Sequence, residues 1–443
     1  MREMKDSGVE WIGEIPSNWE VKKLNNVANK ITDYVASGSF ADLNKNVQYL
    51  DEPDYAMLVR TADLSGTKDK KIYIDKSAYE FLANSNLFGG EVILSNIGSV
   101  GNVFYFKLLY ERCSLAPNSI MVSDSPNNKY LYYWFVNPIA NDELKRIGGN
   151  AVQLKFNKTQ LKQFKVLCPP DDEQQRIVKF LDSKCAQIDS IISKQEAIIE
   201  KLKEYKLSVI TEAVTKGLNP DVEMKDSGNY KIGKIPSSWS MQKMSIVCNT
   251  ITDYVASGSF ASLAENVKYL DDPDYAMLIR TVDVSDKGRD SKPVYIDKKA
   301  YDFLSNSNLY GGEIILPNIG ASVGDVYEVP RLYERMSLAP NSIMFKTKYN
   351  DKYYYYYFLS DPGKKSLIEM SQSAAQPKFN KTELRMLRVP VPSISQQNEI
   401  VQKLDKVINR IDSQINKITE IIAKTEEYKK SLIYEVVTGK KEV

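Results

Sequence analysis

Apolar residues recur at alternating steps of three and four along two long stretches, one beginning after Pro170 and one after Pro392. This heptad spacing puts one apolar stripe on a helix and is typical of a coiled-coil seam. In each stretch, eight of ten seam positions are apolar. We therefore predict two long helices, over 171–217 and 394–439, that pack on each other. We expect Asp171 or Asp172 to cap the first helix, with Gln174 or Gln175 at the N3 position. The apolar seam positions include Leu181, Ile188, Ile192, Ile199, Leu202 and Val209 in the first helix and Leu404, Ile408, Ile411, Ile415, Ile422 and Leu432 in the second.

Before each heptad stretch, the pattern changes to short runs of β-branched and aromatic residues separated by turn residues, which predicts strands. The aromatic-rich runs at 130–136 and 353–359 instead predict helices. This mixture indicates an α+β (or α/β) globule ahead of each long helix. In the first globule the predicted strands lie at 55–60, 71–74, 91–94 and 102–106.

The chain consists of two copies of one unit of about 220 residues. Residues 31–40 recur letter for letter as 251–260, and 114–121 recur as 337–344. Copies related by a pseudo-two-fold axis would run their helices antiparallel, with a globule at each end of a rod. The alternative is a stripe that only covers its own globule. The expected boundaries are a first globule at 1–170, a first helix at 171–217, a linker at 218–236, a second globule at 237–393 and a second helix at 394–439.

Composition narrows the classes of function. The chain has 443 residues, 59 Lys and Arg against 57 Asp and Glu, and no His. The lack of His excludes Ser-His and Cys-His nucleophile pairs and every His metal site. The near-neutral charge excludes a uniformly basic surface for polyanions but leaves room for a local basic groove. No apolar run is long enough to span a membrane, and the N-terminus has no apolar signal core, so we expect a cytoplasmic protein.

Each of the four cysteines aligns with an apolar residue in the other copy, which argues against a disulfide or a metal site. We therefore predict that they are small buried apolar residues. Cys113, Cys168, Cys185 and Cys248 stand opposite Met336, Val391, Ile408 and Ala28.

Polar and small residues dominate the stretches that the two copies share. Asn, Ser and Arg side chains read base edges, Lys contacts phosphates, and Gly lets a backbone approach closely. The shared segment 33–40 is predicted to be a loop, and a repeated loop that the fold simply needs is the alternative explanation. The candidate DNA contacts are Asp33, Tyr34, Ser37, Ser39, Arg60, Thr61, Asn96, Ser99, Lys155, Asn157 and Lys158 in the first copy and Asp253, Tyr254, Ser257, Ser259, Arg280, Thr281, Asn318, Ser322, Lys378, Asn380 and Lys381 in the second.

A nuclease site is a further alternative. Pro53-Asp54 with Asp69-x-Lys71 has the form of the Pro-Asp…Asp-x-Lys site of restriction-type nucleases, in which two carboxylates and a lysine hold Mg²⁺ and a water. The second copy offers Pro273-Asp274 with Asp290-x-Lys292. However, the Asp-x-Lys parts fall in the least similar stretch of the two copies, and such a motif arises easily in a chain with 26% charged residues.

Over essentially its full length, the chain resembles the specificity subunits of type I restriction-modification systems. The segments that carry the resemblance are 5–24, Phe-Gly-Gly-Glu-Val-Ile-Leu at 88–94, and the junction at 169–178 with the helix that follows. The order of globule, helix, globule and helix is specific in combination. The second junction departs slightly, with Asn398 where the first has Gln175.

This resemblance implies two target-recognition domains that each read one half of a split double-stranded DNA site, with helices that fix the gap between the halves. It implies that the helices dock two modification (adenine methyltransferase) subunits, which carry S-adenosylmethionine. It also implies restriction subunits, which use ATP and Mg²⁺ for translocation and cleavage. No catalytic residue, metal or cofactor is expected on this chain itself. An interaction scaffold unrelated to DNA is the competing explanation.

The repeat adds a hypothesis of its own. Because the candidate reading segments of the two copies match almost completely, we expect the two half-sites to be the same or nearly so, in inverted orientation. Such a site is an interrupted palindrome. Half-site centres about one helical turn apart would suit readers that enter successive major grooves.

Overall fold

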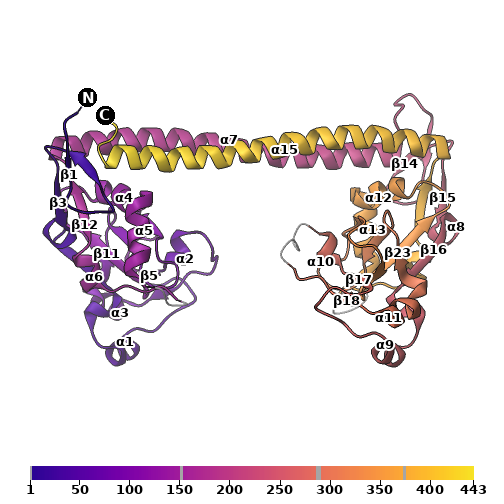
Figure 1. Ribbon diagram of the computed structural model, residues 1–443, viewed down its shortest axis with the longest axis horizontal. Helices are drawn as coiled ribbons and strands as arrows, with labels where there is room; N and C mark the ends of the chain where they lie inside the picture. The colour runs from indigo at the N-terminus through magenta and orange to yellow at the C-terminus, as the bar shows by residue number, and fades with distance from the viewer. Residues whose placement is uncertain (1, 150–152, 286–290, 373–375) are drawn as a thin grey trace. The chain divides into compact units, whose positions relative to one another are not determined.

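The computed structural model describes residues 2–149, 153–285, 291–372 and 376–443. Two long helices, α7 (Asp171–Lys216) and α15 (Ile394–Val437), run through the chain. The chain divides into unit 1, Met1–Gln195 with Thr419–Val443, and unit 2, Glu196–Ile418. Each unit therefore holds part of both long helices (Figure 1). None of the helices within these ranges has the length and apolar character needed to cross a membrane.

Unit 1 contains two four-stranded sheets in its described part. In the sheet β4–β11–β8–β9, the central strand β11 runs antiparallel to both β4 and β8, whereas in the sheet β6–β5–β10–β7 strand β10 runs parallel to β5. Two-stranded ladders join β1 to β2 and β3 to β12. The strands are β1 (Met4–Asp6), β2 (Glu14–Pro16), β3 (Glu20–Lys23), β4 (Lys30–Asp33), β5 (Ala56–Val59), β6 (Tyr73–Ile74), β7 (Asn86–Leu87), β8 (Val92–Ser95), β9 (Val103–Tyr105), β10 (Cys113–Leu115), β11 (Ser119–Ser123) and β12 (Lys165–Cys168), and the helices before α7 are α1 (Phe40–Asn46), α2 (Thr61–Leu64), α3 (Lys76–Phe81), α4 (Asn128–Val136), α5 (Pro138–Ile147) and α6 (Lys158–Lys162).

Unit 2 repeats this topology, with sheets β16–β23–β20–β21 and β18–β17–β22–β19. Its strands are β13 (Met224–Asp226), β14 (Lys234–Pro236), β15 (Ser240–Lys243), β16 (Cys248–Asp253), β17 (Ala276–Ile279), β18 (Tyr295–Ile296), β19 (Asn308–Leu309), β20 (Ile314–Pro317), β21 (Tyr327–Glu328), β22 (Met336–Leu338), β23 (Ser342–Thr347) and β24 (Arg388–Val391), and its helices before α15 are α8 (Met244–Val247), α9 (Phe260–Asn266), α10 (Thr281–Val284), α11 (Lys298–Phe303), α12 (Asp351–Leu359), α13 (Asp361–Ser371) and α14 (Lys381–Met386).

The aromatic helices α4 and α12 attach each globule to the long helices. In unit 1, Tyr133 donates a 2.7 Å hydrogen bond to Asp182 of α7, and in unit 2 Tyr356 makes the same contact to Asp405 of α15 at 2.5 Å. The seam residues Leu181 and Leu432 are buried in the same apolar core as α4. The apolar stripe therefore serves both as a seam between the helices and as a wall of the globule's core.

Within each unit the long helices lie side by side and run antiparallel (Figure 1). Unit 1 holds the first part of α7 and the last part of α15, and unit 2 holds the remainder of both. In unit 1, Lys429 of α15 donates a 2.6 Å hydrogen bond to Asp189 of α7. In unit 2, Lys206 of α7 binds Asp412 of α15 at 2.7 and 2.8 Å. Both lysines occupy seam positions that the heptad pattern leaves polar. Charged pairs at such positions favour one register of two helices over others.

The sequence predicted the fold class, the four strands at 55–60, 71–74, 91–94 and 102–106, and the two aromatic helices correctly. Two local expectations are wrong. Segment 33–40 is not a loop, because β4 ends at Asp33, a short 3-10 helix covers Tyr34–Ser37, and α1 begins at Phe40. Asp171 and Asp172 do not cap α7, because they already belong to its first turn. Gln174 instead donates to the carbonyl of Pro169, at 3.0 Å.

Candidate nucleic-acid interface

Several candidate DNA contacts gather at one edge of the sheet β4–β11–β8–β9. Since β11 is antiparallel to both of its neighbours, β4 and β8 run in the same direction and end at the same edge. Asp33 is the last residue of β4, and Asn96 follows the last residue of β8. We call this edge, together with segment 153–158, the polar edge. The polar edge of unit 2 holds the equivalents Asp253 and Asn318 with segment 376–381.

Asn96 fixes this edge to the segment that carries the candidate lysines. The side-chain nitrogen of Asn96 donates to the backbone carbonyl of Phe156 at 2.9 Å. The backbone carbonyl of Asn96 accepts from the N–H of Phe156 at 3.0 Å. A β-bridge between Ile97 and Lys155 continues the contact. Asn96 thus has a structural role in the free protein, and its buried Oδ1 has no partner among the described residues. Asn318 makes the same contacts with Phe379, at 2.8 and 3.0 Å.

An ion pair ties Lys158 to Asp33. Helix α6 begins at Lys158, and the side chain of Asn157 caps it by accepting from the N–H of Gln160 at 3.0 Å. This position aims the ammonium group of Lys158 at Asp33, 2.8 Å away. Because the carboxylate offsets the lysine charge, Lys158 is less available to a phosphate group than the sequence alone suggested. Unit 2 repeats the arrangement in Asn380, Lys381 and Asp253, with a 2.7 Å ion pair.

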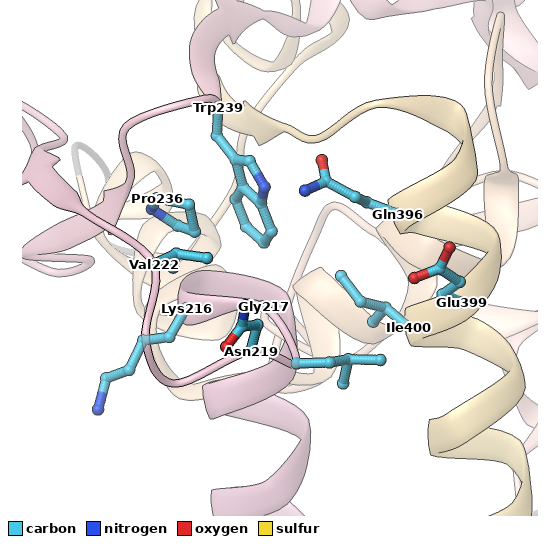
Figure 2. A pocket seen from close by; sticks show the side chains of 10 residues that line it. Lys216, Gly217, Asn219, Val222, Pro236, Trp239, Gln396, Glu399 and Ile400 are labelled. Atoms are coloured by element: carbon cyan, nitrogen blue, oxygen red, sulfur yellow. The ribbon is translucent and has the colours of Figure 1, made fainter.

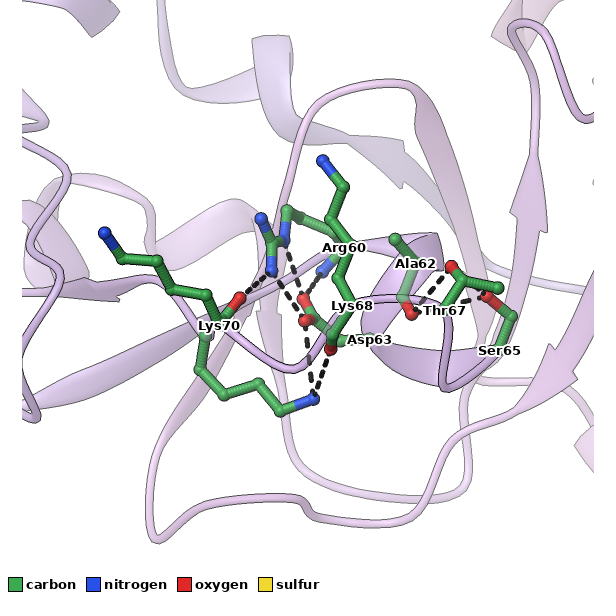
Figure 3. A network of polar contacts seen from close by, with 8 residues as sticks. Arg60, Ala62, Asp63, Ser65, Thr67, Lys68 and Lys70 are labelled. Carbon is green, nitrogen blue, oxygen red and sulfur yellow. Dashed lines mark hydrogen bonds and ion pairs between the residues drawn. The ribbon is translucent and has the colours of Figure 1, made fainter. Parts of the chain in front are cut away.

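Arg60 lies at the end of β5 and is held by its neighbours (Figure 3). Its guanidinium donates two hydrogen bonds to the buried carboxylate of Asp63, at 2.8 and 2.9 Å, and one to the carbonyl of Lys70. Burial alone would raise the pKa of Asp63, but the hydrogen bonds from Arg60 lower that pKa below its usual value. Arg280 binds Asp283 in the same way and adds contacts to Ser291 and Lys292. Thr61 and Thr281 are the half-buried first residues of the short helices that follow.

The candidates in segment 33–39 and its repeat mostly support the local fold. Tyr34 is only 5% exposed and packs in an apolar core with Leu43, which corrects its assignment as a surface contact. The hydroxyl of Ser37 is buried, and Ser39 caps α1 through Asp42. The equivalents Tyr254, Ser257 and Ser259 have the same positions in unit 2.

The candidates that remain open to a ligand are fewer. Ser99, Lys155, Asn157, Lys378 and Asn380 are exposed, and Ser322 is half-buried.

One pair of exposed side chains was missed by the sequence reasoning. Phe40 and Phe260 are 72% and 79% exposed at the first position of α1 and α9. The sequence does contain a signal for them: the same residue, Phe, follows the candidate serines Ser39 and Ser259 in both copies.

The described residues do not bring the side chains of the nuclease motif together as a metal site. Asp54 and Asp69 are exposed, and Lys71 contacts Asp63 at 3.6 Å. Asp290 lies outside the described residues, so the second copy of the motif is not placed. Across the described ranges, no group of three acidic or cysteine side chains is positioned to hold a metal ion.

Three of the four cysteines are buried small residues, as predicted. Cys113, Cys185 and Cys248 pack in apolar cores, and Cys168 is half-buried at the end of β12. Burial raises the pKa of the Cys168 thiol to about 11, which keeps it protonated and unreactive at neutral pH.

Comparison with known proteins shows the family to which this chain belongs. Residues 16–204 and 255–423 match the family model described as "Type I restriction modification DNA specificity domain", and the chain belongs to this family. It is a non-catalytic specificity subunit, whose part is to recognise DNA sequence.

Individual relatives agree with this assignment. The chain is 25% identical to the MjaX specificity subunit of Methanocaldococcus jannaschii over 97% of this chain and 95% of that protein. It is 26% identical to the type I restriction enzyme EcoBI specificity subunit of Escherichia coli over 61% of this chain and 57% of that protein. Its fold is similar to a chain in a solved structure that concerns complex assembly and conformational transition of a type I R-M system. That match has a TM-score of 0.66 and 12% identity and covers 96% of this chain and 98% of the other.

Proposed function

We propose that each unit reads one half of a bipartite DNA site and that the two halves are the same, in inverted orientation. One observation carries this proposal: the paired and anchoring residues of the polar edge, and their contacts, are the same in both units. The pair Asp33–Lys158 is repeated as Asp253–Lys381, and the anchor Asn96–Phe156 as Asn318–Phe379. Two nearly identical reading surfaces recognise the same or nearly the same base sequence.

In this proposal, α7 and α15 fix the gap between the two half-sites, and their outward faces dock two modification subunits. Lys194, Glu196 and Lys203 are exposed on α7 and are available for such contacts. Adenine methylation with S-adenosylmethionine then belongs to the modification subunits, and ATP- and Mg²⁺-dependent translocation and cleavage belong to the restriction subunits. A chain of similar fold occurs in a solved structure that concerns complex assembly of a type I R-M system, and this supports assembly with partner subunits.

Sequencing of methylated adenines in a strain that expresses this chain with its modification subunit tests the proposal. We expect one interrupted palindrome, methylated on both strands. Two unrelated half-sites would contradict it. A gel-shift assay with the same complex separates a DNA reader from an interaction scaffold, because a scaffold shows no preference for the methylated sequence.

A further inference from the structure

A pocket in unit 2 lies between the end of α7 and the start of α15 (Figure 2). It has a volume of about 110 Å³, and Gly217, Val222, Pro236, Trp239, Gln396 and Ile400 are among its lining residues. A water molecule occupies about 30 Å³ in the liquid, so the pocket has room for a group larger than one water.

The indole N–H of Trp239 makes this pocket more than a packing gap. Trp239 is 1% exposed, and its Nε1 has no hydrogen-bond partner among the described residues. In Figure 2 this nitrogen faces the side-chain amide of Gln396. A buried donor without an acceptor costs free energy, which a ligand that brings an acceptor recovers.

Unit 1 shows which acceptor suits this position. There the equivalent Trp19 donates to the carboxylate of Glu173 at 2.9 Å, and Arg2 also binds that carboxylate. In the repeat, Val222 stands in place of Arg2, and Gln396 stands in place of Glu173. Unit 2 has therefore kept the indole donor and lost both the carboxylate and its guanidinium partner.

The side chain of Gln396 cannot replace the lost acceptor. Its Oε1 accepts from the N–H and the hydroxyl of Ser393, both at 3.1 Å, in the cap at the start of α15. These bonds fix the orientation of the Gln396 side-chain amide. Its Nε2, which is a second hydrogen-bond donor, therefore points toward Trp239. The positive end of the helix dipole of α15 lies at the same place. The one carboxylate that lines the pocket, Glu399, accepts from Ser395 at 3.2 Å.

We infer that the pocket beside Trp239 binds a carboxylate group, held by Trp239 Nε1–H, by Gln396 Nε2–H and by the positive end of α15. The carboxylate comes either from a small organic acid or from an acidic residue or C-terminus of a partner subunit. This site is separate from the polar edge, so the inference does not depend on the DNA-reading proposal.

Indole ¹⁵N–¹H NMR spectra of the full chain, labelled on its four tryptophans, test this inference. Sodium acetate is titrated against sodium chloride at equal ionic strength, and Trp239→Phe assigns the signal. We expect acetate to move the Trp239 signal in a saturable way and to leave the Trp19 signal in place, because Trp19 already has Glu173. In Gln396→Glu, the new carboxylate should move the Trp239 signal without acetate and abolish the titration.

The remaining outcomes are also decisive. No movement of the Trp239 signal with acetate, together with no movement when the modification subunit is added, would mean that the pocket holds water only and would overturn the inference. Movement with the subunit alone, lost in Gln396→Glu, identifies a protein carboxylate as the ligand. Equal movement of all four signals, or the same movement with chloride, would show a general salt effect and would also overturn it.

Discussion

Lys158 of α6 donates a 2.8 Å hydrogen bond to Asp33 at the end of β4, 125 residues earlier in the chain. The same contact joins Lys381 to Asp253. At the surface where we expect DNA, each unit thus pairs a lysine with an acid. This pairing is consistent with the net charge of +2 and with a chain that binds DNA weakly without its partner subunits.

Removing the acid should strengthen binding to DNA of any sequence. Asp33→Asn leaves the charge of Lys158 uncompensated, so one more phosphate contact forms and the slope of log affinity against log salt steepens by about one. Fluorescence anisotropy with unrelated duplexes at several salt concentrations measures this slope. The control is Asp221→Asn, which removes an exposed carboxylate in the linker. Equal slopes in the two variants would contradict the position of Lys158 at the DNA.

Substitution of Arg60 should lower the stability of the folded protein, whether or not Arg60 also contacts DNA. Arg60→Ala leaves the buried carboxylate of Asp63 without its two charged hydrogen bonds, which should cost about 2 kcal/mol of unfolding free energy. Arg60→Ala with Asp63→Ala should cost less than Arg60→Ala alone, because the buried carboxylate that has lost its guanidinium partner is then removed as well. Urea unfolding of the single and double variants measures the difference. Strictly additive losses would contradict the proposed pairing.

Equivalent Leu→Ala substitutions in the coiled-coil seam should lower the unfolding free energy by similar amounts in the two units. Leu181 and Leu404 are fully buried equivalents, so Leu181→Ala and Leu404→Ala should each cost about 2–5 kcal/mol. Ile198→Ala serves as the control, because Ile198 is an exposed residue on α7 and should change stability by less than about 0.5 kcal/mol. Thermal or urea unfolding followed by circular dichroism provides the measurement. A loss at Ile198 as large as that at Leu181 would mean that the seam has been assigned to the wrong face.

Glu173 should make unit 1 sensitive to acid. Burial alone would raise the pKa of Glu173, but hydrogen bonds from Arg2 and Trp19 lower it below its usual value. A carboxyl whose pKa is lower in the folded state stabilises the protein above its unfolded pKa, and this stability is lost as pH falls through the folded pKa. We expect wild type to lose more unfolding free energy than Glu173→Gln between pH 6 and the acid range.

Gln396→Glu offers a matched comparison for this prediction, since it introduces a carboxylate beside the equivalent tryptophan in unit 2. If wild type and Glu173→Gln lose the same stability on acidification, the pairing of Arg2, Trp19 and Glu173 contributes nothing to the acid response.

The spacing of apolar residues along the chain predicted the helices and strands that are set by neighbouring residues. The heptad positions from Leu181 to Leu432 marked both long helices, and alternating runs marked strands such as β5 and β8. The repeat predicted that whatever one unit has, the other has as well. The exceptions are single substitutions, such as Val222 for Arg2, whose effect depends on a partner far away in sequence.

The partners of the candidate residues could not be predicted in the same way. The bond from Lys158 to Asp33 and the anchor from Asn96 to Phe156 join segments that only the folded sheet brings together. Tyr34 looked like a surface residue because its neighbours are small and polar, yet its ring fills a core. The placement of the two globules on a rod and the proposed domain boundaries stay predictions.

The composition of unit 1 has a consequence for synthesis on the ribosome. Unit 2 is one continuous segment, but the core of unit 1 includes Leu432 and Val436, close to the C-terminus. Domains usually fold in the order in which they are made, starting from the N-terminus. Here that order is reversed: the globule that leaves the ribosome first must wait for the last turns of α15 before its apolar core is closed, while the globule made second already has its whole segment.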